Sequence, residues 1–159
     1  MSTETTNTIT LIETAQQNLI KLLEPYTIEQ KNTIPAGFNN NLIWNFAHSV
    51  AVLQLLCYSR SGLDTRLDSE FVQAYKNGSK PKEFVSENEY QLYLQYASDA
   101  ISFLKTDYDN SHFKNFTGFT TAVGLTITTF ELVLQYVLYH YGMHIGYVMA
   151  LRKVLNQNG

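Results

Sequence analysis

Hydrophobic residues recur along most of this chain at spacings of three and four, which is the pattern of amphipathic helices. The first such segment runs from about Thr8 to Glu24, and Pro25 ends it. The second, from about Asn40 to Ser61, is apolar nearly all round, which predicts a buried helix. Gly62 follows it as a plausible helix terminator.

Two further long helices are predicted in the C-terminal half. Ser86 and Glu89 fit a capping box that opens a helix running to about Lys105. The last long segment extends from Thr126 to about Leu155, and a short helix is expected at Asp68–Tyr75.

Four long helices with one short extra helix predict an all-α four-helix bundle. The strict alternation of strands is missing almost everywhere, and Phe116–Ile127 is the one stretch that remains ambiguous between helix and strand. No repeat, low-complexity tract or linker divides the chain, so residues 1–159 are expected to form a single domain.

Composition narrows the possible functions. The net charge is only −3 and no block of Lys or Arg is present, which argues against binding of nucleic acid. One cysteine excludes an internal disulfide framework. The first residues lack the pattern of a secretory signal, and polar side chains interrupt the longest apolar-rich stretch, Phe130–Leu151. We therefore expect a cytoplasmic protein without a membrane span.

The histidines are the best candidates for chemistry. His140 and His144 stand four residues apart on a predicted helix, so their imidazoles project from one face with Cβ atoms about 5–6 Å apart. Such a pair can bind one metal ion, although the spacing also arises by chance. The surrounding face carries no Lys, Arg, Asp or Glu, so the pair points into a core or a pocket, where an unpaired imidazole is costly.

His48 has a similar setting on the second predicted helix. One buried histidine is commonly a hydrogen-bonded core residue, whereas three on the inward faces of two helices fit a three-ligand metal site with one open position. A metal there lowers the pKa of a bound water or thiol. The residues expected to support the ligands or line a pocket, as hydrogen-bond donors or as packing, are Asn41, Trp44, Tyr136 and Tyr147.

Other residues do not join this site. Cys57 lies nine residues after His48, on the opposite side of the helix, and is expected in the core. His112 lies in a polar stretch and is expected to be exposed to solvent. No catalytic residue can be named from the sequence.

Two segments resemble a known family. The sequence Asn-Leu-Ile-Trp-Asn-Phe-Ala-His ending at His48, and the segment His140–Lys153, are similar to the stretches that deliver the metal histidines in DinB/YfiT-like proteins. The resemblance covers essentially the whole chain. It implies an up-down-down-up four-helix bundle, a divalent metal (often zinc or nickel) held by His48, His140 and His144, and frequently a homodimer.

The resemblance also implies an activity. Characterised members include S-transferases that use bacillithiol or mycothiol, a thiol-dependent maleylpyruvate isomerase and a few hydrolases. Transfer of a low-molecular-weight thiol to an electrophile is therefore expected, and the alternative is a metal-binding or vestigial bundle without turnover, a dimerisation or stress-related accessory module. Relatives often have Glu after the first histidine of His-x-Gly-x-His, where this chain has Tyr141. That position lies about 100° from the metal face, so the ligands are retained while a polar helper is missing.

Gly142 and Gly146 lie one turn apart on the last predicted helix, away from the histidine face. Each lowers helix propensity by about 1 kcal/mol, so a compensating close contact is expected. Packing against the first or third long helix is the simpler explanation, and a dimer interface, which the family resemblance favours, is the other.

Overall fold

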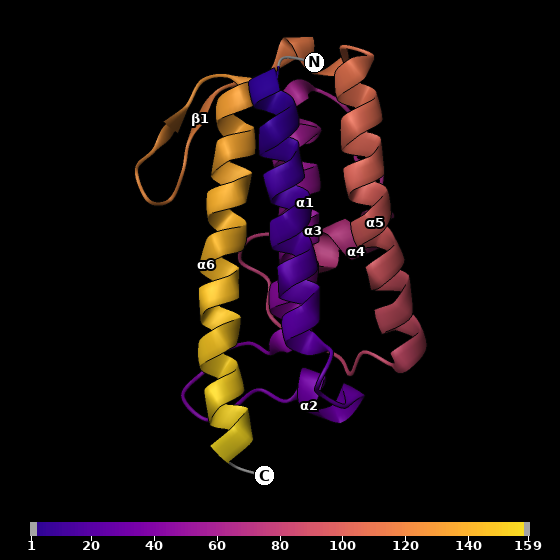
Figure 1. The fold of residues 1–159 in the computed structure, drawn as a ribbon, viewed down its shortest axis with the longest axis vertical. Coiled ribbons are helices and arrows are strands. Elements are labelled where there is room, and N and C mark those ends of the chain that lie inside the picture. Colours follow the sequence, from indigo (N-terminus) through magenta and orange to yellow (C-terminus); the bar gives the residue numbers. More distant parts are fainter. Residues whose placement is uncertain (1–2, 158–159) are drawn as a thin grey trace.

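The computed structural model describes residues 3–157 and consists mainly of four long helices (Figure 1). These are α1 (Thr3–Leu23), α3 (Leu42–Cys57), α5 (Glu87–Asp109) and α6 (Phe130–Gln157). The shorter helical elements are α2 (Ile28–Asn32), η1 (Ser59–Ser61), α4 (Ser69–Ala74) and η2 (His112–Asn115). Two antiparallel strands complete the described chain: β1 (Phe119–Thr120) and β2 (Thr126–Ile127).

The four long helices form the predicted bundle. In Figure 1, α1 and α6 run downwards while α3 and α5 run upwards, so the order along the chain is that of an up-down-down-up bundle. Because α3 and α5 are parallel, the segment 58–86 has to return along the bundle before α5 begins, and it carries the predicted short helix α4. Helix α6 packs mainly against α1 and α3, so the second and fourth long helices are neighbours.

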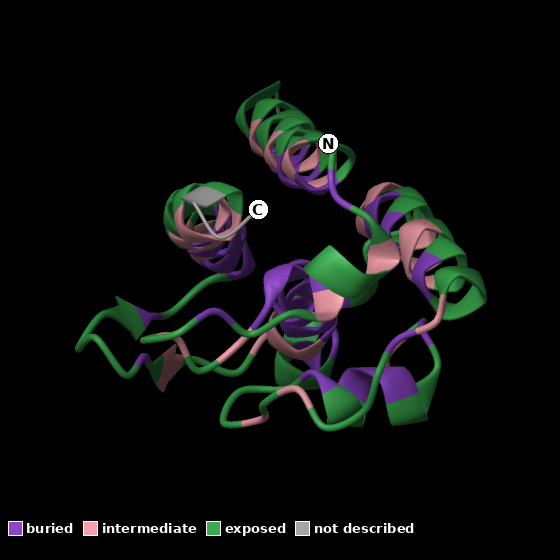
Figure 2. Cartoon of the chain, turned by 90° about the horizontal axis from the view of Figure 1, so that it is seen from below, coloured by how far each residue is buried: buried purple, intermediate pink, exposed green. Residues whose placement is uncertain are grey.

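Helix α3 forms the centre of the core, and 14 of its 16 residues are buried. Figure 2 shows the buried faces of the long helices turned towards the interior. The stretch Leu42–Ser61 is long and apolar enough to cross a membrane by length and composition alone, but most of it is buried inside the bundle. That degree of burial is typical of a core helix of a bundle.

The ambiguous region before α6 is a β-hairpin. Thr126 and Ile127 pair with β1, so α6 begins at Phe130 and not at Thr126. The Thr129 hydroxyl accepts a hydrogen bond from the Leu132 amide and caps the start of the helix. The predicted boundary was wrong because the apolar side chain of Ile127 continues the helical spacing into the strand.

Local signals explain two other boundaries. The capping box of Ser86 and Glu89 is present as predicted, and α5 continues past Lys105 to Asp109. The segment after Pro25 contains α2, which opens with a capping box formed by Thr27 and Gln30.

The two glycines of α6 do not pack closely against another helix. Gly142 and Gly146 are exposed, and a Cβ atom added to either would meet nothing within 4 Å. The expected close contact with the first or third long helix is therefore wrong. Tyr139 and Met143, also exposed, lie beside them on α6.

Candidate metal centre

Three histidines from α3 and α6 meet between the two helices. One potential ligand atom from each of His48, His140 and His144 lies within 4.8 Å of the other two. The ring centroids are 5.1 Å apart for His48 and His140, 5.0 Å for His48 and His144, and 4.5 Å for His140 and His144. His48 and His140 are 92 residues apart in sequence, and the packing of α3 against α6 brings the three imidazoles together.

His48 is fixed by a hydrogen bond at the edge of its ring and by an aromatic side chain on its face. Its Nδ1 lies 2.7 Å from the carbonyl oxygen of Tyr75, which can only accept a hydrogen bond, so Nδ1 carries the proton and the lone pair is on Nε2. Trp44 stacks on one face of the ring, with ring centroids 4.4 Å apart and planes 11° apart. The Trp44 indole in turn donates to the Ser79 hydroxyl at 3.1 Å. The ring of His48 therefore has a defined tautomer and orientation.

His144 is oriented by a buried amide. The side-chain nitrogen of Asn45 donates to the Asn41 carbonyl oxygen at 2.8 Å and to the Asn40 side-chain oxygen at 2.9 Å. These two acceptors turn Asn45 Oδ1 towards His144, where it lies 2.8 Å from Nδ1. An amide oxygen only accepts, so Nδ1 of His144 carries the proton and Nε2 keeps its lone pair.

His140 lacks such a partner. Its Nδ1 is buried and forms no hydrogen bond with the described residues. A buried imidazole nitrogen without a partner is unfavourable, and coordination of a metal by this ring would offset that cost. His140 is therefore the one member of the cluster whose tautomer the protein leaves open.

All three rings are held neutral. Burial, together with the neighbouring His144 and His48, lowers the pKa of His140 to about 2. Burial and His48 lower the pKa of His144 to about 4. Burial also lowers the pKa of His48, although the hydrogen bond to the Tyr75 carbonyl opposes the shift. Only neutral imidazole coordinates a metal, so the site is in its binding form at neutral pH.

The donor set fits a divalent metal such as zinc. Zinc–nitrogen bonds of about 2.1 Å in a tetrahedral site place two ligand atoms about 3.4 Å apart. The three candidate atoms all lie within 4.8 Å of one another, so the three rings converge on one position. Three protein ligands also leave a fourth position for a small molecule.

The cluster opens into a cavity of about 900 Å³. Helices α3 and α6 form two of its walls, and the β-hairpin and residues near Asn40 contribute to its rim. Trp44, Tyr136 and Tyr147 all line it, as do Asn45 and the three histidines. None of the described residues that line it is a carboxylate or a cysteine.

Comparison with known proteins identifies the family to which this chain belongs. The family model described as DinB superfamily matches residues 11–148, which is most of the chain. The chain belongs to the DinB superfamily. No curated protein matches it.

A solved structure has the same fold. YfiT from Bacillus subtilis, described as a probable metal-dependent hydrolase with an unusual four-helix bundle topology, is similar with a TM-score of 0.55. The two sequences are 21% identical, and the match covers 96% of this chain and 89% of YfiT. At this identity the likeness establishes the fold, so the chemistry of this DinB-superfamily chain has to be argued from its own residues.

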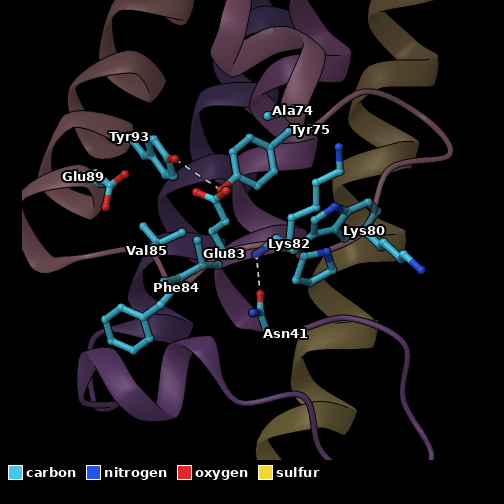
Figure 3. A pocket seen from close by; sticks show the side chains of 13 residues that line it. Asn41, Ala74, Tyr75, Lys80, Lys82, Glu83, Phe84, Val85, Glu89 and Tyr93 are labelled. Carbon is cyan, nitrogen blue, oxygen red and sulfur yellow. Dashed lines mark hydrogen bonds between the residues drawn. The ribbon is translucent and has the colours of Figure 1, made fainter.

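Asn41 lies outside the histidine cavity. Its Oδ1 accepts a hydrogen bond from the Trp44 amide at 2.8 Å and caps α3, and its Nδ2 donates to the Asn32 carbonyl oxygen. Its side chain lines a separate cavity of about 250 Å³ beside Tyr75 (Figure 3). Asn41 therefore supports the site through its own carbonyl oxygen, which holds Asn45, and not as a lining residue.

Tyr141 is a core residue. It is fully buried, and its hydroxyl donates to Gln16 Oε1 at 2.9 Å. Gln16 then donates to the Ala97 carbonyl oxygen at 2.9 Å, so the chain of hydrogen bonds ties α6 to α1 and α5. In this member of the DinB superfamily, Tyr141 therefore stabilises the bundle and does not line the histidine cavity.

The two remaining candidates lie away from the cavity. Cys57 is fully buried, and burial raises the pKa of its thiol, so it is a core residue as predicted. His112 is exposed, with 46% of its side chain accessible, and its Nδ1 lies 3.1 Å from a carboxylate oxygen of Asp107.

Sequence reasoning missed two groups that orient the ligands. Asn45 stands three residues before His48, so the two side chains are neighbours on the surface of α3. This spacing could have identified Asn45 as part of the site. The Tyr75 carbonyl had no such signal, because a backbone oxygen is present at every position and only the path of the chain after α4 selects this one.

Proposed function

We propose that this chain is a divalent-metal-dependent enzyme that transfers a small thiol to an electrophilic substrate. The observation that carries the proposal is the convergence of three neutral imidazoles on one wall of a large cavity without a lining carboxylate. His48, His140 and His144 would hold the metal, with His48 oriented by Tyr75 and His144 by Asn45. Such a metal would supply Lewis acidity that lowers the pKa of a thiol in the open position.

The lining residues favour a thiol over water as the nucleophile. Hydrolysis at a zinc site commonly uses a carboxylate as general base, as in helices that carry His-Glu-x-x-His. None of the described residues that line this cavity is Asp or Glu. A thiol needs no such base, because coordination deprotonates it outright.

The cavity is large enough for two reactants. Its volume of about 900 Å³ is at the upper end of the range of small-molecule sites. Trp44, Tyr136 and Tyr147 give it an aromatic lining near the histidines, which would hold the apolar part of an electrophile. In the transfer, the thiolate sulfur bonds to the electrophilic carbon, and the leaving group departs with its electron pair.

Metal-dependent hydrolysis is the second candidate, and the fold shared with YfiT favours it. A metal-binding bundle without turnover, acting as an accessory module, is the third. The three candidates differ in a property that can be measured directly: whether the purified protein needs a thiol, needs only water, or has no activity.

The test is a conjugation assay with metal-loaded protein. The electrophile is monochlorobimane, whose thiol adducts are fluorescent, and the thiols are bacillithiol, mycothiol, glutathione and cysteine. We expect at least one thiol to react faster than in the uncatalysed control, and His140→Ala to abolish the difference. Hydrolysis of ester substrates without any thiol dependence would favour the second candidate, and no turnover with any thiol or ester would favour the third.

A further inference from the structure

One residue of the histidine cavity carries a formal charge at neutral pH. It is Arg60, and every other described lining residue is apolar, a neutral amide or hydroxyl, or an imidazole. A single cation in a cavity without carboxylates gives this part of the surface a positive potential. The cavity therefore favours a ligand that carries a negative charge.

Arg60 lies at the far end of the cavity from the metal ligands. It belongs to η1, which directly follows α3, and it stands 12 residues after His48. Helical rise places the two backbones about 18 Å apart along the axis. Between them, Val52, Leu55 and Leu56 line the cavity, so its middle is apolar.

The guanidinium group of Arg60 is positioned but not neutralised. Its Cζ lies 4.4 Å from the centroid of the Phe119 ring, which holds it against the β-hairpin. Its backbone carbonyl accepts a hydrogen bond from the Thr117 amide, which ties η1 to the segment that leads into the same hairpin. No carboxylate in residues 3–157 forms an ion pair with it, whereas the nearby Arg66 is bound in a fork by Asp107.

We infer that Arg60 binds a carboxylate at one end of an elongated ligand whose other end reaches the three histidines. This inference rests on the proposed function for the identity of the reacting end. Arginine presents parallel N–H donors that match a carboxylate, and stacking on Phe119 leaves the edge of its plane free to donate. The apolar middle of the cavity selects a ligand with an aliphatic or aromatic body.

The first experiment measures the carboxylate preference without any metal. Chelator-treated protein is titrated with octanoate and with octanol in an isothermal titration calorimeter, which needs no reporter group near Arg60. A partly exposed charge-assisted contact predicts that octanoate binds about fivefold to tenfold more tightly than octanol. Arg60→Gln should abolish this preference, and Arg60→Lys should retain part of it.

Lys153→Gln is the matched control, because it removes the same charge from an exposed position that does not line the cavity. It should keep the full preference for octanoate. Equal binding of octanoate and octanol by the unmodified protein, or an unchanged preference in Arg60→Gln, would overturn the inference.

A second titration separates this inference from the proposed function. Zinc-loaded protein is titrated with ω-mercaptooctanoate and with octanoate. If the thiol adds no affinity while octanoate is still preferred over octanol, the proposed thiol–metal contact fails and the Arg60 inference stands. If the thiol adds affinity but the carboxylate does not, the inference fails and the proposed function stands.

Discussion

Asn45 on α3 and His144 on α6 are 99 residues apart in sequence, and Asn45 Oδ1 accepts a hydrogen bond from His144 Nδ1 at 2.8 Å. The contact couples the two helices that supply the candidate ligands. It also selects the tautomer of His144 whose Nε2 is free, because the Asn45 amide nitrogen is engaged by Asn40 and Asn41. Uncharged amide groups alone therefore set the orientation and the tautomer of His144.

The first prediction concerns this support. Asn45→Ala should weaken metal binding by about 10-fold to 100-fold, as is typical when a group that orients a metal ligand is removed. Metal affinity is measured by competition with a chromogenic chelator. Gln54→Ala is the control: Gln54 is a fully buried amide on the same helix, and its oxygen accepts a hydrogen bond from the Arg66 amide, so its removal should lower stability and leave metal affinity unchanged. Equal metal affinity in Asn45→Ala and the unmodified protein would contradict the assigned role.

Tyr141 provides a prediction about stability. Tyr141→Phe removes the hydroxyl that donates to Gln16 and leaves a buried amide oxygen unpaired, which should lower the free energy of unfolding by about 1–3 kcal/mol. Urea denaturation measures the loss, and metal content should be unaffected. A loss of metal without a loss of stability would show that Tyr141 acts on the site and not on the bundle.

Acid should destabilise the metal-free protein. The pKa values of His140 and His144 are lowered from 6.5 to about 2 and about 4 by burial and neighbouring imidazoles, and that of His48 is also lowered. The unfolded chain therefore binds more protons below about pH 6.5, and the free energy of unfolding should fall as pH drops from there towards 4. Each histidine contributes at most about 1.4 kcal/mol per pH unit.

The measurement is urea denaturation of chelator-treated protein across that window. Asp107, whose pKa is held below 3.8 chiefly by hydrogen bonds from Arg66, should affect stability only at lower pH. A flat free energy of unfolding over the window would contradict the neutral state of the cluster.

The exposed glycines lead to a prediction about assembly. We propose that the face of α6 containing Gly142, Gly146 and Met143 contacts a second copy of the chain, as the family resemblance leads us to expect. Alanine has room at both glycines, so in an isolated chain Gly142→Ala and Gly146→Ala should each stabilise by about 1 kcal/mol. At a close interface the same changes should weaken association. Sedimentation at micromolar concentration measures this, and a monomeric unmodified protein would contradict the dimer.

Much of the architecture was predictable because it follows from local patterns. Spacings of three and four located the long helices, and Ser86 and Glu89 gave the start of α5 through a capping box that the structure contains. The hairpin was not predictable in the same way. Two-residue strands are too short for an alternating pattern, and Phe119 and Ile127 are paired by the turn between them and not by a local preference.

The candidate site was predictable only in part. The spacing of His140 and His144 and the apolar setting of His48 pointed to a common location, and the fold brings them together. Contacts between segments distant in sequence were not visible, including the Tyr75 carbonyl that orients His48. The location of the Arg60 charge in the cavity likewise depends on how η1 packs against the hairpin, and no spacing in the sequence predicts that contact.

The metal content of purified protein tests the central claim most directly. Elemental analysis of the unmodified chain and of His112→Ala should find about one divalent ion per chain, since three histidines form one site. His48→Ala, His140→Ala and His144→Ala should each lose most of that metal while circular dichroism shows the helices intact, because each removes a ligand. Equal metal content in all four variants, or an unmodified protein that takes up no metal when supplied with zinc or nickel, would contradict the three-histidine site.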